Sequence, residues 1–173
     1  MNTMTESRHL GSNSVAPNVE QVDRHNDPQM QETENRFKQF LAESGLEKSD
    51  VPKWLAVDSL SLSVMLGIDL RRRIKSDGCA IPYHDLNGNV RNHQGIPFYR
   101  MRIFQPIMQD DGKQGPKYLS PAGARDAIYI PEKARLRIRD GNASILIITE
   151  GEKKADVAGF VNPHISGAEA LGG

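Results

Sequence analysis

The chain has 173 residues, of which 38% are hydrophobic and 25% charged, a composition that suits one globular domain of ordinary size or one and a half small ones. Its 22 basic and 22 acidic residues give a net charge of zero, so any nucleic-acid surface must be a local patch. Without a secretory signal or the ~18 consecutive apolar residues of a membrane span, we expect a cytoplasmic protein with no membrane contact. The single cysteine, Cys79, excludes an intrachain disulfide and is expected to be a buried apolar residue.

The predicted elements begin after a polar segment. Residues 1–33 are rich in Asn, Ser, Gln and Glu and contain few clustered hydrophobic side chains, so we expect a disordered tail. Beyond it, Phe37, Phe40 and Leu41 recur at helical spacing, which predicts a short helix that ends near Gly45.

A second short helix is expected over residues 49–55. Ser49 or Asp50 can cap it, and Pro52 suits its first turn. Trp54 lies among leucines, which favours a place in the core over a base-stacking role.

The next segment contains the densest positive charge of the chain. Residues 60–68 are apolar with interleaved serines and leave helix and turn both open. The run Arg71–Arg73 with Lys75 is either a solvated face or a phosphate-contacting patch.

Residues 79–104 have the pattern of β-strands separated by a turn at Asp85–Gly88. In the last strand, residues 98–104, apolar and basic side chains alternate, so strand geometry places Arg100 and Arg102 on one face. Two guanidinium groups on a common face could hold successive phosphates. A half-exposed strand with solubilising charges is the alternative.

The chain is organised around the hydrophobic stretch Ile145–Ile148, which comes after a loop at 110–116 and a short strand at 127–131. Its β-branched residues predict a buried, central parallel strand, and Gly151 permits the tight turn into a helix. Glu150 is then placed at the carboxyl edge of the sheet, where open α/β sheets bind ligands.

The stretch Glu150–Ala155, which reads Glu-Gly-Glu-Lys-Lys-Ala after a hydrophobic strand, resembles the first strand, acidic residue and helix of the Toprim fold of bacterial primases and topoisomerases. It is still more similar to a domain of unknown function in phage and plasmid primase-like proteins. The arginine-bearing strand and the Lys-Tyr-Leu-Ser-Pro segment Lys117–Pro121 stand in the same order as in primase catalytic cores. The resemblance covers residues 37–171.

This resemblance implies an α+β fold. Residues 34–140 would form a primase-like region of N-terminal helices and mixed β structure, and residues 141–173 the first βαβ unit of an incomplete Toprim-like domain. The implied protein belongs to a mobile element and acts in DNA replication. Its partners would be DNA or RNA, with a helicase or a second chain that completes the domain.

The resemblance also assigns roles to individual residues. Glu150 corresponds to the family's catalytic, metal-linked carboxylate, and Mg²⁺ is the implied cofactor. The nucleic-acid- and phosphate-binding positions correspond to Arg100, Arg102, Lys117, Tyr118 and Lys153. From the residues alone, Lys117 would be a surface residue and Tyr118 a packing residue.

The chain departs from the Toprim pattern in its acidic residues. The family adds an Asp-x-Asp pair on a later strand, as two-metal chemistry requires, and no such pair follows Glu150. Glu152 and Asp156 lie four apart on the predicted helix and are expected to be a solvent-facing pair. We therefore expect the front portion of a longer protein, inactive alone, that binds Mg²⁺ only when the missing acids are supplied.

Two alternatives stay open at this point. A non-catalytic nucleic-acid-binding module would keep the basic groove without a metal site. An unrelated α+β protein with accidental motif matches would have no affinity for DNA. DNA binding and metal-dependent nucleotide incorporation distinguish these hypotheses.

Overall fold

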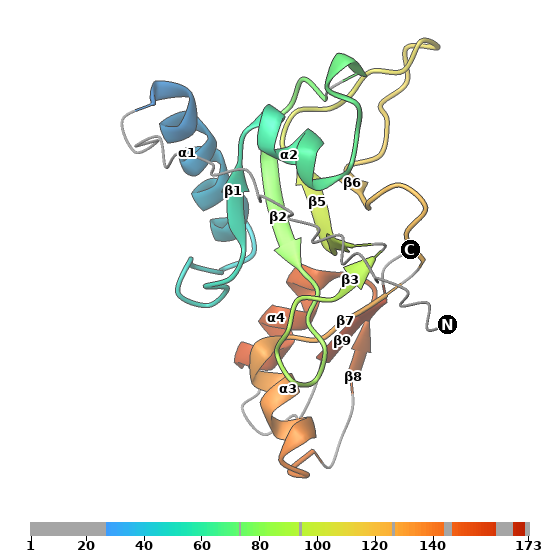
Figure 1. The fold of residues 1–173 in the computed structure, drawn as a ribbon. Coiled ribbons are helices and arrows are strands. Elements are labelled where there is room, and N and C mark those ends of the chain that lie inside the picture. The colour runs from blue at the N-terminus through green and yellow to red at the C-terminus, as the bar shows by residue number, and fades with distance from the viewer. Residues whose placement is uncertain are drawn as a thin grey trace, which may run out of the picture.

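The computed structural model describes residues 27–72, 74–93, 95–125, 127–143, 147–161 and 168–171, with side chains up to Ala158. The predictions for residues 1–26 and for Arg73, Ile145 and Leu146 lie outside these ranges. Both helices and strands are present, so the predicted α+β class is confirmed. Helices and strands form an upper and a lower part in Figure 1, each built around its own sheet.

The upper part is a four-stranded antiparallel sheet in the order β1-β2-β5-β6. Its strands are β1 (Leu55–Val57), β2 (Gly78–Pro82), β5 (Tyr99–Ile103) and β6 (Tyr118–Leu119). Every residue of β2 is buried, because successive side chains point to opposite faces and both faces are covered. Cys79 and Ile81 pack in one hydrophobic cluster with α1, whereas Ala80 packs in another with the α2 residue Leu62.

Helix α1 (Pro28–Ala42) begins earlier than the composition predicts. Asp27 caps it by accepting a hydrogen bond from the Gln29 amide at 2.9 Å, and Pro28 has the fixed backbone angle that suits a first turn. Thr33 is buried and donates to Asp77 at 3.0 Å, so the helix is held against the sheet. The assignment of residues 28–33 to a tail is therefore wrong.

The predicted end of α1 is confirmed, and the helix expected next is not formed. Gly45 follows α1 with a φ of 67°, the left-handed conformation that commonly terminates helices. Residues 49–53 form turns, in which the Asp50 carboxylate accepts from the Glu47 amide at 2.8 Å instead of capping a helix. Trp54 is 1% exposed and belongs to the core, as predicted.

Short elements surround the upper sheet. Helix α2 (Ser59–Met65) resolves the ambiguity over residues 60–68, and the 3₁₀ helix η2 (Leu70–Arg72) follows it. Strands β3 (Asn92–His93) and β4 (Ile96–Pro97) form a small hairpin.

The lower part contains the sheet β7-β9-β8, flanked by helices α3 (Glu132–Arg139) and α4 (Glu152–Val161). Strands β8 (Ile147–Thr149) and β9 (Ala168–Leu171) pair in parallel on either side of α4 in the chain, so the predicted βαβ unit is present. Strand β7 (Ile128–Tyr129) pairs antiparallel with β9. The sequence did not predict α3.

Strand β8 differs from the buried central strand that its composition predicts. It lies at the edge of the described sheet, and the Ile148 side chain is 56% exposed. A β-branched run is favoured at any pleated, half-buried position, so it cannot distinguish an edge strand from a central one.

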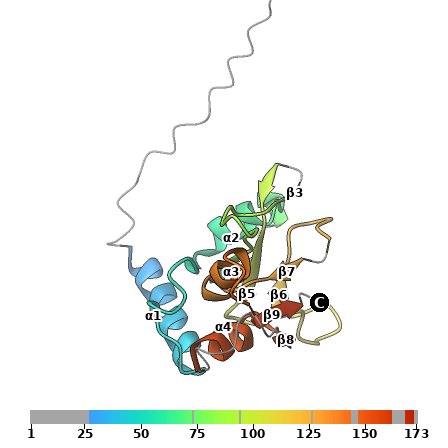
Figure 2. The same ribbon diagram turned by 90° about the horizontal axis from the view of Figure 1, so that it is seen from below.

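One hydrophobic cluster joins the two parts. It combines Phe37 of α1 and Ile81 of β2 with Tyr129 of β7 and Ala155 of α4. Figure 2 shows α4 beside the C-terminal end of α1, where Lys153 Nζ donates to the Phe40 carbonyl at 2.9 Å. Among the described helices, none is long and apolar enough to cross a membrane.

Candidate nucleic-acid interface

A groove of about 760 Å³ lies between the β5-β6 edge of the upper sheet and the beginning of α4. Four of the six predicted site residues line it: Arg100, Tyr118, Glu150 and Lys153. The other two, Arg102 and Lys117, line a separate cavity of about 210 Å³ together with the loop that precedes β6. The structure thus divides the predicted set between two neighbouring cavities.

Strand alternation positions the two arginines as the sequence predicts. Met101 and Ile103 of β5 are buried on one face, and Arg100 and Arg102 lie on the other. Tyr118 pairs with Arg102 in the β5-β6 register, and its ring centroid lies 5.2 Å from Arg100 Cζ and 5.3 Å from Arg102 Cζ. Both guanidinium groups therefore make cation–π contacts with one aromatic ring.

Arg100 forms an ion pair inside the molecule. Its Nη1 lies 3.3 Å from Oε1 of Glu152, and the two side chains are only 13% and 4% exposed. The Tyr83 hydroxyl donates to the same carboxylate oxygen at 2.6 Å, and burial together with this negative neighbour raises the pKa of Tyr83. Because Glu152 already balances its charge, Arg100 contributes less to phosphate binding than its sequence position suggests.

Glu152 and Asp156 do not form the predicted solvent-facing pair. Glu152 is 3% exposed, and Asp156 accepts a hydrogen bond from the Tyr129 hydroxyl at 2.8 Å. Ala155 on the same helix is fully buried. Positions 152, 155 and 156 fall on one helical face, and this face packs against the aromatic core instead of pointing to solvent.

Two further cations contact α1. Arg102 Cζ lies 5.5 Å from the Phe40 ring centroid, and Arg102 Nη1 donates to the Lys117 carbonyl at 3.4 Å. Lys153 Nζ lies 4.0 Å from the same Phe40 ring, and partial burial lowers the pKa of Lys153. The Phe40 ring thus brings together cations from β5 and α4.

Glu150 is the exposed carboxylate at the rim of the groove. Its side chain is 82% exposed and pairs with Lys154 one helical turn later. The hydrogen bond and charge of Lys154 lower the pKa of Glu150, so this carboxylate is ionised at neutral pH.

The donor set does not fit the Mg²⁺ site that the primase resemblance implies. Paired Mg²⁺ ions need several carboxylates, and the second acid of the groove, Glu152, is bound by Arg100 and Tyr83. Within the described ranges, no three His, Cys, Asp or Glu side chains are grouped closely enough to hold a metal ion. These residues therefore do not support a metal-dependent step.

The basic residues of the interface form what we term the cationic strip, which consists of Arg100, Arg102, Lys117, Lys153 and Lys154. Glu150 and Glu152 are the carboxylates beside it. Among the residues that line the two cavities, five positive charges against two negative ones leave three net positive charges in a chain whose total is zero, and the nearby Glu43 also acts on Lys153. Lys117 and Lys154 are exposed to solvent.

Comparison with known proteins finds no matching family model, curated protein or solved structure. The primase-like resemblance therefore stays a prediction.

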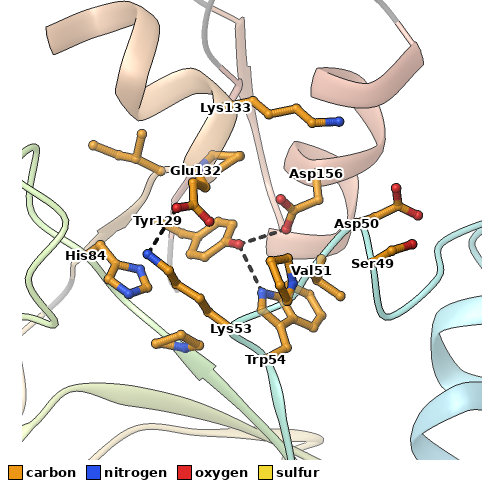
Figure 3. A pocket seen from close by; sticks show the side chains of 14 residues that line it. Ser49, Asp50, Val51, Lys53, Trp54, His84, Tyr129, Glu132, Lys133 and Asp156 are labelled. Carbon is orange, nitrogen blue, oxygen red and sulfur yellow. Dashed lines mark hydrogen bonds and ion pairs between the residues drawn. The ribbon is translucent and has the colours of Figure 1, made fainter.

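Sequence reasoning placed Trp54 in the core but missed the hydrogen bonds by which Trp54, Tyr83 and Tyr129 hold the acids of α4. Tyr83 orients Glu152, and Trp54 Nε1 donates at 3.0 Å to the Tyr129 hydroxyl, which in turn donates to Asp156. The close-up in Figure 3 shows the Trp54–Tyr129–Asp156 arrangement. The sequence offered one signal for the burial of the two acids. Ala155 is apolar and lies three positions after Glu152 and one before Asp156, so it marks this side of the helix as the inward face.

Proposed function

We propose that the chain is a primase-like protein of a mobile element, acting in DNA replication, and that its described part binds nucleic acid along the cationic strip. The observation that supports this is the local concentration of three net positive charges along two neighbouring cavities of about 760 and 210 Å³ in a chain with no net charge. Phosphates are the dominant partners of such surfaces, and every bound cation releases a counterion from the strand.

Within the strip the roles differ by exposure. Lys117 and Lys154 reach solvent and would contact phosphates directly. Arg100 and Lys153 are partly buried and would mainly set the shape and potential of the groove. Tyr118 would act as a support for the two arginines, because their guanidinium groups already contact its ring.

A non-catalytic nucleic-acid-binding module is the second candidate. The ion pair between Arg100 and Glu152 favours it, because this pair removes a carboxylate from the groove that nucleotide transfer would require. A primase-like activity requires further acidic ligands for the metal ions. They would come from the remainder of a longer protein, from a helicase or from a second chain.

Salt-dependent DNA binding tests the strip. In the variant Lys117→Ala/Lys154→Ala, we expect weaker binding of a single-stranded oligonucleotide and a salt slope reduced by roughly 1.4, because each phosphate contact on a single strand contributes about 0.7. The matched control is Lys113→Ala/Arg139→Ala, which removes two exposed cations outside the strip that pair with neighbouring aspartates. An equal loss of slope in the control, or none in the strip variant, would refute the proposal.

A further inference from the structure

A smaller cavity of about 260 Å³, which we call the Trp54 pocket, borders α4 away from the groove. Asp156 of α4 lines this pocket, whereas Lys153 and Val157 of the same helix line the groove. The other walls come from the turn before β1, the end of β2 and the connection between β7 and α3. Figure 3 shows these segments converging around Tyr129.

A directional hydrogen-bond relay forms one side of the pocket. Trp54 Nε1 donates to the Tyr129 hydroxyl at 3.0 Å, and this hydroxyl gives its single proton to Asp156 Oδ2 at 2.8 Å. The rings of Trp54 and Tyr129 meet edge to face with centroids 6.3 Å apart, which fixes the hydroxyl in position. Tyr129 engages Oδ2 of Asp156, so Oδ1 is the oxygen through which a bound molecule can interact with this carboxylate.

The remaining surface of the pocket is mostly apolar. Val51, Pro82, Ile130 and Pro131 are buried residues that line it. His84 also lines it, and burial lowers the pKa of His84, so the imidazole is neutral at pH 7. Apolar walls with one open carboxylate oxygen match a flat ring system that carries an N–H donor.

Lysines stand at the rim of the pocket. Lys53 Nζ lies 3.1 Å from Glu132 Oε1, and both side chains are 42% exposed. Lys133 follows Glu132 on α3, also lines the pocket and is exposed. The acids Asp50 and Glu132 line the same pocket, so the rim combines two cations with two carboxylates and has no net positive charge.

We propose that the Trp54 pocket binds a single nucleobase that carries an exocyclic amino group, which donates a hydrogen bond to Asp156 Oδ1. The volume is just below the range of about 300–1,000 Å³ typical for drug-sized ligands, which suits one base and excludes a dinucleotide. Carboxylates accept hydrogen bonds from base amino groups, and comparison with the deaminated bases tests whether the amino group or a ring N–H is the donor. This site is separate from the cationic strip and does not depend on it.

Fluorescence of Trp54 provides the assay, because it is the single tryptophan of the chain and lines the pocket. The full chain would be titrated with the 5′-monophosphates of adenosine, guanosine and cytidine, and with those of inosine and uridine as deaminated controls. We expect at least one amino-bearing nucleotide to quench the fluorescence and to bind at least tenfold more tightly than its deaminated counterpart. At pH 8, where Asp156 is mostly ionised, Asp156→Asn should weaken its binding at least tenfold, as for a lost charge-assisted hydrogen bond.

The side-chain oxygen of the introduced asparagine can still accept the hydrogen bond from the Tyr129 hydroxyl, so Asp156→Asn keeps the relay. Thermal melting of this variant shows whether it is folded. No binding by any amino-bearing nucleotide, equal affinity in Asp156→Asn, or equal binding of a simple alkylamine would overturn the proposal.

Binding of a single-stranded oligonucleotide shows whether the base in the pocket belongs to a strand or to a free nucleotide. If the base belongs to a strand, Asp156→Asn weakens oligonucleotide binding, and if it belongs to a free nucleotide, only mononucleotide binding changes.

Discussion

Glu152 of α4 accepts a hydrogen bond from the Tyr83 hydroxyl at 2.6 Å and pairs with Arg100 of β5 at 3.3 Å through the same oxygen, Oε1. Tyr83 directly follows β2, so this one carboxylate connects the first turn of α4 to two strands of the upper sheet. The connection fixes the position of the groove, because α4 forms one wall and β5 another. Glu152 therefore contributes to the interface by holding the walls of the groove in place.

We expect Glu152→Ala to lower the free energy of unfolding by about 3–5 kcal/mol, because it leaves the Arg100 charge buried without its carboxylate. Urea denaturation followed by Trp54 fluorescence measures this change. The matched control is Glu150→Ala, which removes an acid that is 82% exposed and should change stability by no more than about 0.5 kcal/mol. Replacing both partners, Arg100→Met with Glu152→Leu, should recover much of the lost unfolding free energy. Equal effects of Glu152→Ala and Glu150→Ala would contradict a stabilising role of the Arg100–Glu152 pair.

The stability of the protein should depend on the protonation of Asp156. Burial, with the negative charges of Glu152 and Asp50, raises the pKa of Asp156 to about 7, while Lys133 and the Tyr129 hydroxyl act in the opposite direction. An unfolded aspartate has a pKa of about 3.9. Between these values the folded state binds a proton that the unfolded state has lost, so stability falls as pH rises from about 4 to 7.

Unfolding free energies of the wild type and Asp156→Asn from pH 4 to 8 test this dependence. The wild type should lose about 1.4 kcal/mol for each unit of pKa difference that the pH crosses, and the variant should lack this component because asparagine does not titrate. Above pH 7 the variant should be the more stable protein. Parallel curves for the two proteins would show that Asp156 has an ordinary pKa in the folded state.

Local patterns predicted several elements correctly. The alternation of residues 98–104 placed Arg100 and Arg102 on one face, and Gly45 marked the end of α1. These features depend on strand periodicity and on the backbone freedom of glycine, which act over a few residues. The parallel pairing of β8 and β9 followed from the same kind of local signal, a strand that runs directly into a helix.

The sequence-based predictions were wrong where contacts with residues far away in the chain decide whether a side chain is buried. Glu152 looked like a surface acid because its neighbours are charged, but Tyr83, 69 positions earlier, buries it and supplies a hydrogen bond. Thr33 looked like part of a polar tail, but Asp77, 44 positions later, anchors it. A buried polar residue needs a partner, and a single sequence does not show which residue that partner is.

The last prediction concerns primer synthesis. We expect the purified chain to catalyse no template-dependent nucleotide incorporation with Mg²⁺ or Mn²⁺, although Glu150 has the position of the catalytic carboxylate in the resemblance to primases. Its carboxylate pairs with Lys154, and Glu152, the second acid of the groove, is held by Arg100 and Tyr83. Two divalent ions require more carboxylate ligands than this arrangement offers.

Incorporation of labelled nucleotides on a primed and an unprimed template measures this activity, and Glu150→Gln separates two roles of the carboxylate. If Glu150 only adds negative charge beside the strip, Glu150→Gln should strengthen DNA binding modestly, with or without Mg²⁺. Robust incorporation by the wild type, abolished in Glu150→Gln, would contradict the prediction and mean that residues outside the described ranges complete a metal site. Activity that returns only when a second chain with acidic residues is added would agree with it, since that chain would supply the ligands that Glu150 lacks.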